Sequence, residues 1–444
     1  MASVIANIFK AKDIRNKVFF TLWILIVYRI GAHIPIPGIN VEALEQFFAQ
    51  AASGKMGGLL NYFDLFAGGA FKRFTVFSLG IMPYISASII LQLLTIVVPS
   101  FEKMSKEGGE GRKKIQKYTK YLTVVLCLFQ AGSLAFYLKN SGEGIVSQDA
   151  GFGFVILCAV TITTGTMILM WLGEQITERG IGNGISLIIY AGIIVRFPAA
   201  LADTLTRIFS KGEPIILLIL LVIFFGVIAA SILLTLGRRN LPIQYGKRSI
   251  GGSTVSNSTQ YLPMPINAGG VIPIIFAVAI MQFPAQISSM INVSADSIFS
   301  TVLLYLSPGQ IPYYIIYILL IVFFCYFYAS IQFNPSDVAS NLQKYQGFIP
   351  GIRPGSSTTE FLTSTLNKLT ISGAIFLAFI ALIPDLLTGM YADQISPEMA
   401  YMFGGTSLLI IVGVALDTLK QLESQLLMRH YDGFFKGGKM RGRR

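Results

Sequence analysis

Long apolar runs constrain the fold of this chain more than any other feature. Most of the runs approach the roughly 20 residues that an α-helix needs to cross about 30 Å of hydrocarbon. Only 13% of the residues are charged, about half of the 25% that is typical of soluble domains. The sequence therefore predicts an all-α polytopic membrane protein with ten transmembrane helices, at residues 18–36, 74–98, 121–138, 153–172, 185–201, 214–236, 269–291, 311–333, 369–387 and 402–416.

Two of the ten runs are weaker than the others. The fifth is interrupted by Arg196 and Pro198, and the tenth is short before Asp417. We expect the tenth helix to continue beyond the membrane into the cytosol.

Basic residues fix the predicted orientation. The N-terminus, the C-terminus and the segments after the second, fourth, sixth and eighth runs together hold 26 of the 34 lysines and arginines. Lysine and arginine accumulate on the cytoplasmic side of membrane proteins. Both termini are therefore expected in the cytoplasm, which agrees with an even number of spans.

A break near residues 206–214 divides the ten runs into two sets of five. Because five is odd, the two sets would have opposite orientations, and inverted repeats often enclose a functional path at their interface. We expect an N-terminal half at 1–210, a C-terminal half at 211–422 and a basic cytosolic tail at 423–444. The halves share no convincing sequence identity, so the repeat is a topological prediction.

The segment 56–70, hereafter the 56–70 segment, is apolar and glycine-flanked but too short to span the membrane. Backbone at membrane depth that does not span must be buried in protein or line a cavity. One interpretation is a re-entrant element that fills a pore from outside. The other is an interfacial helix on the outer surface.

The stretch 80–90 is apolar, yet Pro83, Tyr84, Ser86 and Ser88 interrupt it. A helix that only faces lipid does not need such residues, whereas a helix that lines a gap in a membrane protein can use them.

Isoleucines recur in pairs in four runs, with a spacing of three or four residues in three of them and as neighbours in the fourth. Neighbouring positions on one helix face lie three or four residues apart, and a ring of branched apolar side chains can form a constriction that resists wetting. Contact with lipid or ordinary core packing explains the same pattern. The pairs are Ile85 and Ile89, Ile185 and Ile189, Ile272 and Ile275, and Ile410 and Ile411.

Two cytosolic loops, 237–267 and 334–368, carry candidate docking residues. Lys247 and Arg248 are expected near the tip of the first, and Arg353 lies in the Pro- and Gly-rich stretch 347–355 of the second. Exposed basic residues can bind ribosomal RNA or an acidic protein surface. Positive-inside anchoring and a simple linker remain the alternatives.

Catalytic chemistry has no support in the sequence. His33 and His430 are the two histidines, and all three cysteines lie inside apolar runs, where we expect them to pack as small apolar side chains. We therefore predict no enzyme activity, cofactor or metal. Arg29 and Arg196 lie near the ends of their runs and are expected to snorkel to the interface. The runs are nearly free of ionisable residues, which favours a pore over the alternative, a secondary transporter for a small solute.

The chain resembles the SecY family of protein-export channels over nearly its whole length, from about residue 13 to residue 431. Each motif alone is weak, but together and in order they are specific. The motifs are RIGA at 29–32, IPG at 36–38, GIMPYISASII at 80–90, WLGEQITERGIGNG at 171–184, NAGGVIP at 267–273, IPGIRPG at 349–355 and GGTSLLI at 404–410.

This resemblance implies two five-helix halves around a central pore, with a lateral gate between spans 2 and 3 and spans 7 and 8. It implies a pore ring at Ile85, Ile89, Ile189, Ile272, Ile275 and Ile410. It matches the 56–70 segment to the plug, with Leu59, Leu60, Tyr62, Phe63, Leu65, Phe66, Gly68 and Gly69. Lys247, Arg248 and Arg353 match positions that dock the motor or the ribosome.

The resemblance also implies the function and the partners. A protein-conducting channel passes secretory polypeptides across the bacterial cytoplasmic membrane and releases transmembrane segments sideways into lipid. The implied partners are the small membrane subunits SecE and SecG, the motor ATPase SecA, the ribosome, secretory precursors, nascent membrane proteins and lipids. One departure is that 249–260 holds no basic residue, whereas members of the family often carry more of them there.

Overall fold

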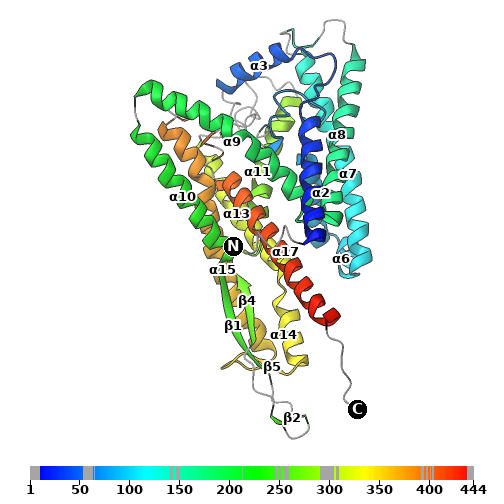
Figure 1. The fold of residues 1–444 in the computed structure, drawn as a ribbon, viewed down its shortest axis with the longest axis vertical. Helices are drawn as coiled ribbons and strands as arrows, with labels where there is room; N and C mark the ends of the chain where they lie inside the picture. Colours follow the sequence, from blue (N-terminus) through cyan, green and yellow to red (C-terminus); the bar gives the residue numbers. More distant parts are fainter. Residues whose placement is uncertain are drawn as a thin grey trace.

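Helices arranged side by side dominate the computed structural model (Figure 1). The structure describes residues 11–53, 64, 66–140, 144–146, 151–212, 214–245, 249–250, 253–254, 260–290, 305–306, 310–391, 395–396, 399–400, 402 and 405–437.

Each of the ten predicted runs coincides with a helix. In order, these helices are α2 (Lys12–Gly31), α5 (Met82–Val97), α7 (Gly109–Asn140), α8 (Phe152–Arg179), α9 (Gly184–Lys211), α10 (Ile215–Leu236), α11 (Ile272–Met290), α13 (Ile311–Gln332), α15 (Ser356–Tyr391) and α17 (Gly405–Gly437). Within the described ranges, three further helices lie between them: α3 (Val41–Ser53), α6 (Pro99–Lys106) and α14 (Pro335–Lys344).

Length and composition identify six membrane-spanning candidates among the described residues: α7, α8, α9, α10, α15 and a stretch that runs through α13 and α14. A seventh is added if α5 and α6, which are bent by 99° at the break between them, count as one span. The all-α polytopic architecture is therefore confirmed, and α17 continues far beyond the predicted tenth run, as expected.

The second span differs from its prediction. The apolar run begins at residue 74, but α5 begins at Met82 with Pro83 in its first turn. Residues 71–81 instead form turns, and Thr75 makes an isolated β-bridge with Pro35. Proline favours the first turn of a helix and disfavours helical backbone at the residue before it. Hydropathy alone therefore placed the start of this helix too early.

Capping residues explain why other helices begin where they do. The side chain of Asn183 accepts hydrogen bonds from the backbone N–H groups of Ile185 and Ser186 at the start of α9. Asn334 caps α14 in the same way, with Pro335 in the first turn. Such caps satisfy backbone donors that have no partner inside the helix. Pro198, which weakened the fifth run, is accommodated within α9.

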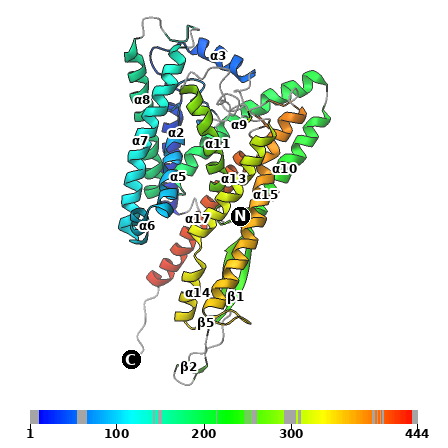
Figure 2. The ribbon, with the colours of Figure 1, turned by 180° about the vertical axis from the view of Figure 1, so that it is seen from behind.

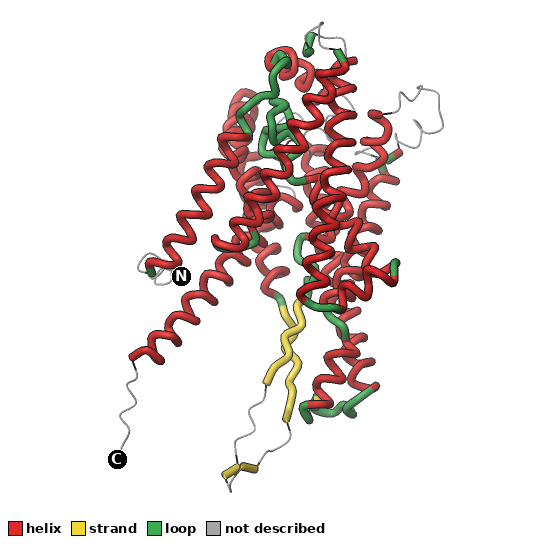
Figure 3. Tube along the Cα trace, turned by 90° about the vertical axis from the view of Figure 1, so that its right-hand side faces the viewer, coloured by secondary structure: helices red, strands yellow, loops and turns green. Residues whose placement is uncertain are grey.

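The loops predicted at 237–267 and 334–368 form a small β-structure below the helices (Figure 3). Strand β1 (Arg238–Tyr245) pairs antiparallel with both β4 (Gln260–Pro265) and β5 (Gly347–Phe348). Two short strands, β2 (Ser249–Ile250) and β3 (Ser253–Thr254), pair with each other. The sheet therefore joins the two cytosolic loops, which the sequence left as separate polar segments.

The buried side chains form two large hydrophobic clusters. Every fully buried member of one cluster lies between Ile24 and Ala191. The other is built mostly from residues 216–410, together with members from α5 and α9. In agreement with this division, α2, α7 and α8 lie on one side of the molecule and α10 and α15 on the other (Figures 1 and 2).

The outward faces of the helices remain apolar. On α10, Leu218, Val222 and Phe225 are 65%, 64% and 63% exposed. A helix that is apolar on all sides, including its exposed side, is suited to a lipid environment. The three cysteines are free and buried, as the sequence predicted.

Candidate functional site: an apolar centre and the segment beside it

Six isoleucines from four helices meet in one hydrophobic cluster. Ile85 and Ile89 come from α5, Ile189 from α9, Ile410 from α17, and Ile272 and Ile275 from α11. Those from α5, α9 and α17 are at most 7% exposed, and the two from α11 are partly buried. We call these six residues the isoleucine cluster. All six residues that the family resemblance implies for the pore ring belong to this large cluster, and their role in a pore ring stays a prediction.

Part of the 56–70 segment packs against the same cluster. Phe66 is 4% exposed and belongs to the hydrophobic cluster that contains the six isoleucines. Ala67 and Ala70 are also buried. For this part of the segment, burial within the protein disfavours the interfacial-helix interpretation. Five of its predicted residues lie outside the described residues: Leu59, Leu60, Tyr62, Phe63 and Leu65.

Two glycines allow this segment to approach α9 closely. A Cβ atom added to Gly68 would lie 2.9 Å from the Gly192 Cα, and one added to Gly192 would lie 3.3 Å from the Phe66 carbonyl oxygen. Gly68 also has a φ of 65°, in the left-handed region that favours glycine. No larger residue fits either position without displacing the backbone.

The end of the 56–70 segment is also held by polar contacts. The Asp64 carboxylate is completely buried and forms an ion pair with the Arg196 guanidinium of α9. Its Oδ1 accepts a hydrogen bond from the Lys72 backbone N–H at 2.9 Å, and the Lys72 Nζ lies 3.9 Å from its Oδ2. From α2, Arg29 donates a hydrogen bond to the Gly68 carbonyl oxygen at 2.9 Å.

These contacts correct the expectation that Arg29 and Arg196 snorkel to the membrane interface. Both guanidinium groups contact residues of the 56–70 segment instead. The physical reason is Asp64, because a buried carboxylate is costly unless a cation or hydrogen-bond donors compensate it. The sequence carried a signal that we did not use, since Asp64 is the only acid in the 56–70 segment.

The helices predicted to form the seam are in contact. Helix α5 packs against α7, and α11 packs against α13. Between these two pairs, α11 contacts both α5 and α7. The apolar centre therefore lies beside a junction between early and late helices of the chain.

In the loops predicted to be cytosolic, the structure describes one of the three predicted docking residues. Arg353 is exposed in the turn between β5 and α15, and its carbonyl oxygen accepts a hydrogen bond from the Thr358 hydroxyl at 2.8 Å. Lys247 and Arg248 lie outside the described residues. Within the described part of the chain, no group of three or more His, Cys, Asp or Glu residues could hold a metal ion.

Two solved structures share the architecture described above. One, described as the structure of a protein conducting channel, matches with a TM-score of 0.62 and 20% identity over 92% of both chains. Sec61 in the canine ribosome–channel complex from the endoplasmic reticulum matches with a TM-score of 0.61 and 20% identity, also over 92% of both chains. The fold is therefore that of a polytopic membrane channel.

Sequence comparison places the chain in a family. The SecY family model matches residues 75–419. The protein translocase subunit SecY of Thermotoga maritima is 43% identical over 442 residues, covering 99% of each chain. That of Mycobacterium tuberculosis is 41% identical over 455 residues, covering 98% of this chain and all of the relative. The chain belongs to the SecY family.

The family membership establishes the class of activity. The chain is a multi-pass membrane protein and a protein-conducting channel subunit of the Sec translocon, and it is not an enzyme. This decides against the solute-transporter alternative.

Proposed function

We propose that this subunit passes secretory polypeptides across the bacterial cytoplasmic membrane and releases transmembrane segments sideways into lipid. The observation that carries the proposal is the isoleucine cluster, to which four helices from both ends of the chain contribute. A channel for polypeptides must let a chain cross while ions do not. Apolar side chains that meet at the centre can exclude water and ions while remaining able to move apart.

The 56–70 segment acts as the plug in this proposal. The buried Phe66 lies in the same hydrophobic cluster as the six isoleucines, which supports a role in sealing the resting pore. The segment would leave this position when a polypeptide enters.

The seam between α5 and α7 on one side and α11 and α13 on the other is the proposed lateral gate. Support comes from the contacts of α11 with α5 and α7, since this junction must part for a segment to leave sideways. A hydrophobic segment gains about 0.3–0.6 kcal/mol for each Leu-like residue that enters lipid. The gate itself therefore needs no chemical energy source.

The proposed halves, 1–210 and 211–422, are supported by the two hydrophobic clusters. One is built from residues before α10, and the other mostly from residues after it. The second cluster also includes residues of α5 and α9, so the two halves share an apolar contact that movement between them would have to separate.

Directional work must come from partners, because a channel subunit breaks no bond. We propose SecA and the ribosome as alternating partners at the cytosolic face, with SecE and SecG as small membrane subunits. Exposed Arg353, together with Lys247 and Arg248, would supply positive charge to this face. In this proposal both termini lie in the cytoplasm.

Site-specific photocrosslinking tests the path of the polypeptide. A photoreactive amino acid replaces Ile189 in the isoleucine cluster, and in a matched variant it replaces Ile194, which is 38% exposed on the same helix. A translocating precursor arrested midway should crosslink to position 189 far more than to position 194. Equal crosslinking, or crosslinking at position 194 alone, would contradict a path through the isoleucine cluster.

A further inference from the structure

The ion pair between Asp64 and Arg196 joins the 56–70 segment to α9. The pair must therefore separate before Asp64 can move away from that helix. Asp64 belongs to the segment, whereas Arg196 belongs to α9, which also contributes Ile189 to the isoleucine cluster. The Asp64 side chain is completely buried, and the Arg196 side chain is 19% exposed. The charges thus link the segment to a wall of the apolar centre.

Several neighbouring hydrogen bonds also hold the described part of this segment in place. The Gly69 N–H donates a hydrogen bond to the main-chain carbonyl oxygen of Asp64 at 3.0 Å, which ties the backbone of Asp64 to the glycine pair. Tyr28 and Arg29 of α2 donate hydrogen bonds to the carbonyl oxygens of Ala67 and Gly68. The hydrogen bonds from Gly69, Tyr28 and Arg29 go to backbone carbonyl oxygens. The contact between Asp64 and Arg196 of α9 instead joins two opposite charges.

The burial of the Asp64 carboxylate determines how strongly the ion pair can hold the segment to α9. Coulombic attraction is weak between solvated charges and much stronger where water is excluded. A buried carboxylate that loses its cationic partner is left uncompensated. Movement of the segment away from Arg196 leaves the Asp64 carboxylate with the Lys72 backbone N–H and the more distant Lys72 Nζ, which lies 3.9 Å from its Oδ2. The contact with Arg196 is therefore the closer of these two ionic contacts of Asp64.

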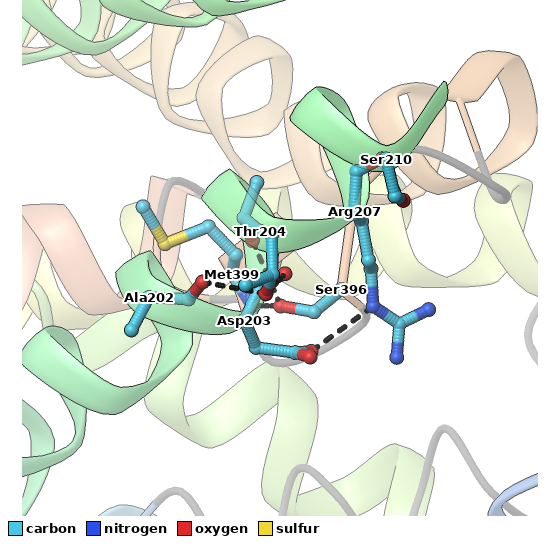
Figure 4. Close-up of polar contacts among 8 residues, drawn as sticks. Ala202, Asp203, Thr204, Arg207, Ser210, Ser396 and Met399 are labelled. Atoms are coloured by element: carbon cyan, nitrogen blue, oxygen red, sulfur yellow. Dashed lines mark hydrogen bonds and ion pairs between the residues drawn. The ribbon is translucent and has the colours of Figure 1, made fainter. Parts of the chain in front are cut away.

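A second Asp–Arg pair on α9 provides a comparison (Figure 4). Arg207 Nε lies 3.1 Å from Asp203 Oδ2, and the two side chains are 44% and 50% exposed. Exposed pairs of this kind contribute little to stability. Helix α9 thus carries one arginine that pairs with a buried carboxylate of another segment and one that pairs with an exposed carboxylate of α9 itself.

We propose that the Asp64–Arg196 ion pair is an electrostatic latch that holds Asp64 and residues 66–70 of the segment against α9 in the resting channel. Arg196 acts as a positioning residue, since it fixes the segment and does not itself touch the translocating chain. Opening then includes separation of this pair, and the pair sets how often the resting channel opens without a polypeptide. The inference rests on the proposed function, because it assumes that the segment is the plug.

The first test measures exposure of the segment directly. Ala67, which is 2% exposed, is replaced by cysteine in a chain whose three native cysteines are changed to alanine. The complex is reconstituted in liposomes and treated with a membrane-impermeant thiol reagent. Asp64→Asn and Arg196→Gln should each raise the labelling rate at least about tenfold, which corresponds to about 1.4 kcal/mol. An unchanged rate in both variants would overturn the latch.

Two further variants separate a latch from general destabilisation. In the double variant Asp64→Asn/Arg196→Gln, labelling should rise no further than in the single variants, because both remove the same interaction. Arg196→Lys keeps the charge and should lie closer to the parent chain than Arg196→Gln. Additive effects in the double variant, or equal effects of Lys and Gln, would contradict an ionic latch. If Asp64→Asn does not assemble, the Arg196 variants still decide the question.

Arg207→Gln is the matched control on the same helix, and it should leave the labelling rate unchanged. Resting ion conductance in planar bilayers, measured with a chain that lacks residues 56–70, tests the plug assignment itself. If this deletion raises conductance but the Asp64 and Arg196 variants do not, the latch fails and the plug assignment stands. If the deletion leaves conductance unchanged, the plug assignment fails.

Discussion

At the scale of single residues, the function depends on which positions at the apolar centre carry polar atoms. Branched apolar side chains from α5, α9, α11 and α17 meet at the centre, and four of the six isoleucines are buried. A hydrogen-bonding group at one of these positions would give water a partner in a region that otherwise offers none. Shape matters as well, because the neighbouring Gly68 and Gly192 allow no side chain between the 56–70 segment and α9.

The first prediction concerns Ile189, which is 4% exposed. Ile189→Asn should raise the resting ion conductance of the reconstituted channel several-fold, because the amide stabilises water in the isoleucine cluster. Ile189→Leu, which keeps the volume and the apolar character, should conduct like the parent chain. Planar-bilayer recording measures both, and equal conductance of the Asn variant and the parent would argue against a seal formed by this cluster.

The second prediction concerns Gly68. Gly68→Ala should lower the thermal stability of the purified complex, since a left-handed alanine costs about 1–2 kcal/mol and its Cβ would lie 2.9 Å from the Gly192 Cα. Gly212→Ala is the matched control, because Gly212 has a φ of 71° with nothing within 4 Å of an added Cβ. A larger decrease in Tm is expected for Gly68→Ala. Equal decreases in Tm for the two variants would mean that the close approach of Gly68 to α9 contributes nothing to thermal stability.

The sequence predicted the members of the isoleucine cluster but not the contacts beside it. The family resemblance selected Ile85, Ile89, Ile189 and Ile410, which are buried in one hydrophobic cluster, and their role as a pore ring stays a prediction. The pairing of Asp64 with Arg196 was not predictable in the same way, because 132 residues separate them and no local pattern specifies a distant partner.

At the scale of elements, apolar runs predicted the helices well because lipid requires long, continuous apolar segments. Their ends were less predictable. The start of α5 depends on Pro83, and α15 extends well beyond the predicted run, from Ser356 to Tyr391. The strands β1 and β4 were missed because each contains proline, which disfavours a strand assignment, although they pair within one loop. The strand β5 was missed because it has two residues and pairs with β1 from a distant loop.

The third prediction concerns the cytosolic elements. Arg353→Glu should reduce ATP-driven import of a secretory precursor about tenfold or more while leaving thermal stability unchanged, because the side chain is exposed. Lys344→Glu, at the exposed end of α14, makes the same change of charge on the same face. Import assays with SecA measure both variants. If Lys344→Glu reduces precursor import as much as Arg353→Glu does, import would depend on the net charge of this face and not on the position of Arg353.

At the scale of the whole molecule, the first and last helices meet on one side. Lys17 of α2 donates a hydrogen bond to the Gln425 side chain of α17 at 3.3 Å, and the Gly182 N–H donates one to Gln421. Ile14 of α2 and Ile181 pack in a small hydrophobic cluster with Leu422 and Leu426 of α17. Helix α2 and the later part of α17 are thereby held together, in agreement with the even number of predicted spans.

The fourth prediction follows from this arrangement. Epitope tags at both termini should be digested by protease added to inverted membrane vesicles and should resist protease added to intact spheroplasts. A tag at residue 213, in the segment between α9 and α10, should show the reverse pattern. Opposite accessibility of the two terminal tags would require an odd number of spans and would contradict the inverted halves.

The most direct test of the central claim, that this chain forms the path for polypeptides, is a protease-protection assay. The purified chain, with SecE and SecG, is placed in liposomes with SecA, ATP and a radiolabelled secretory precursor. The account predicts that the precursor becomes protected from added protease only when both ATP and this chain are present. If no precursor is protected, while the same SecA and precursor are active with another SecY channel, this chain would not conduct proteins as proposed.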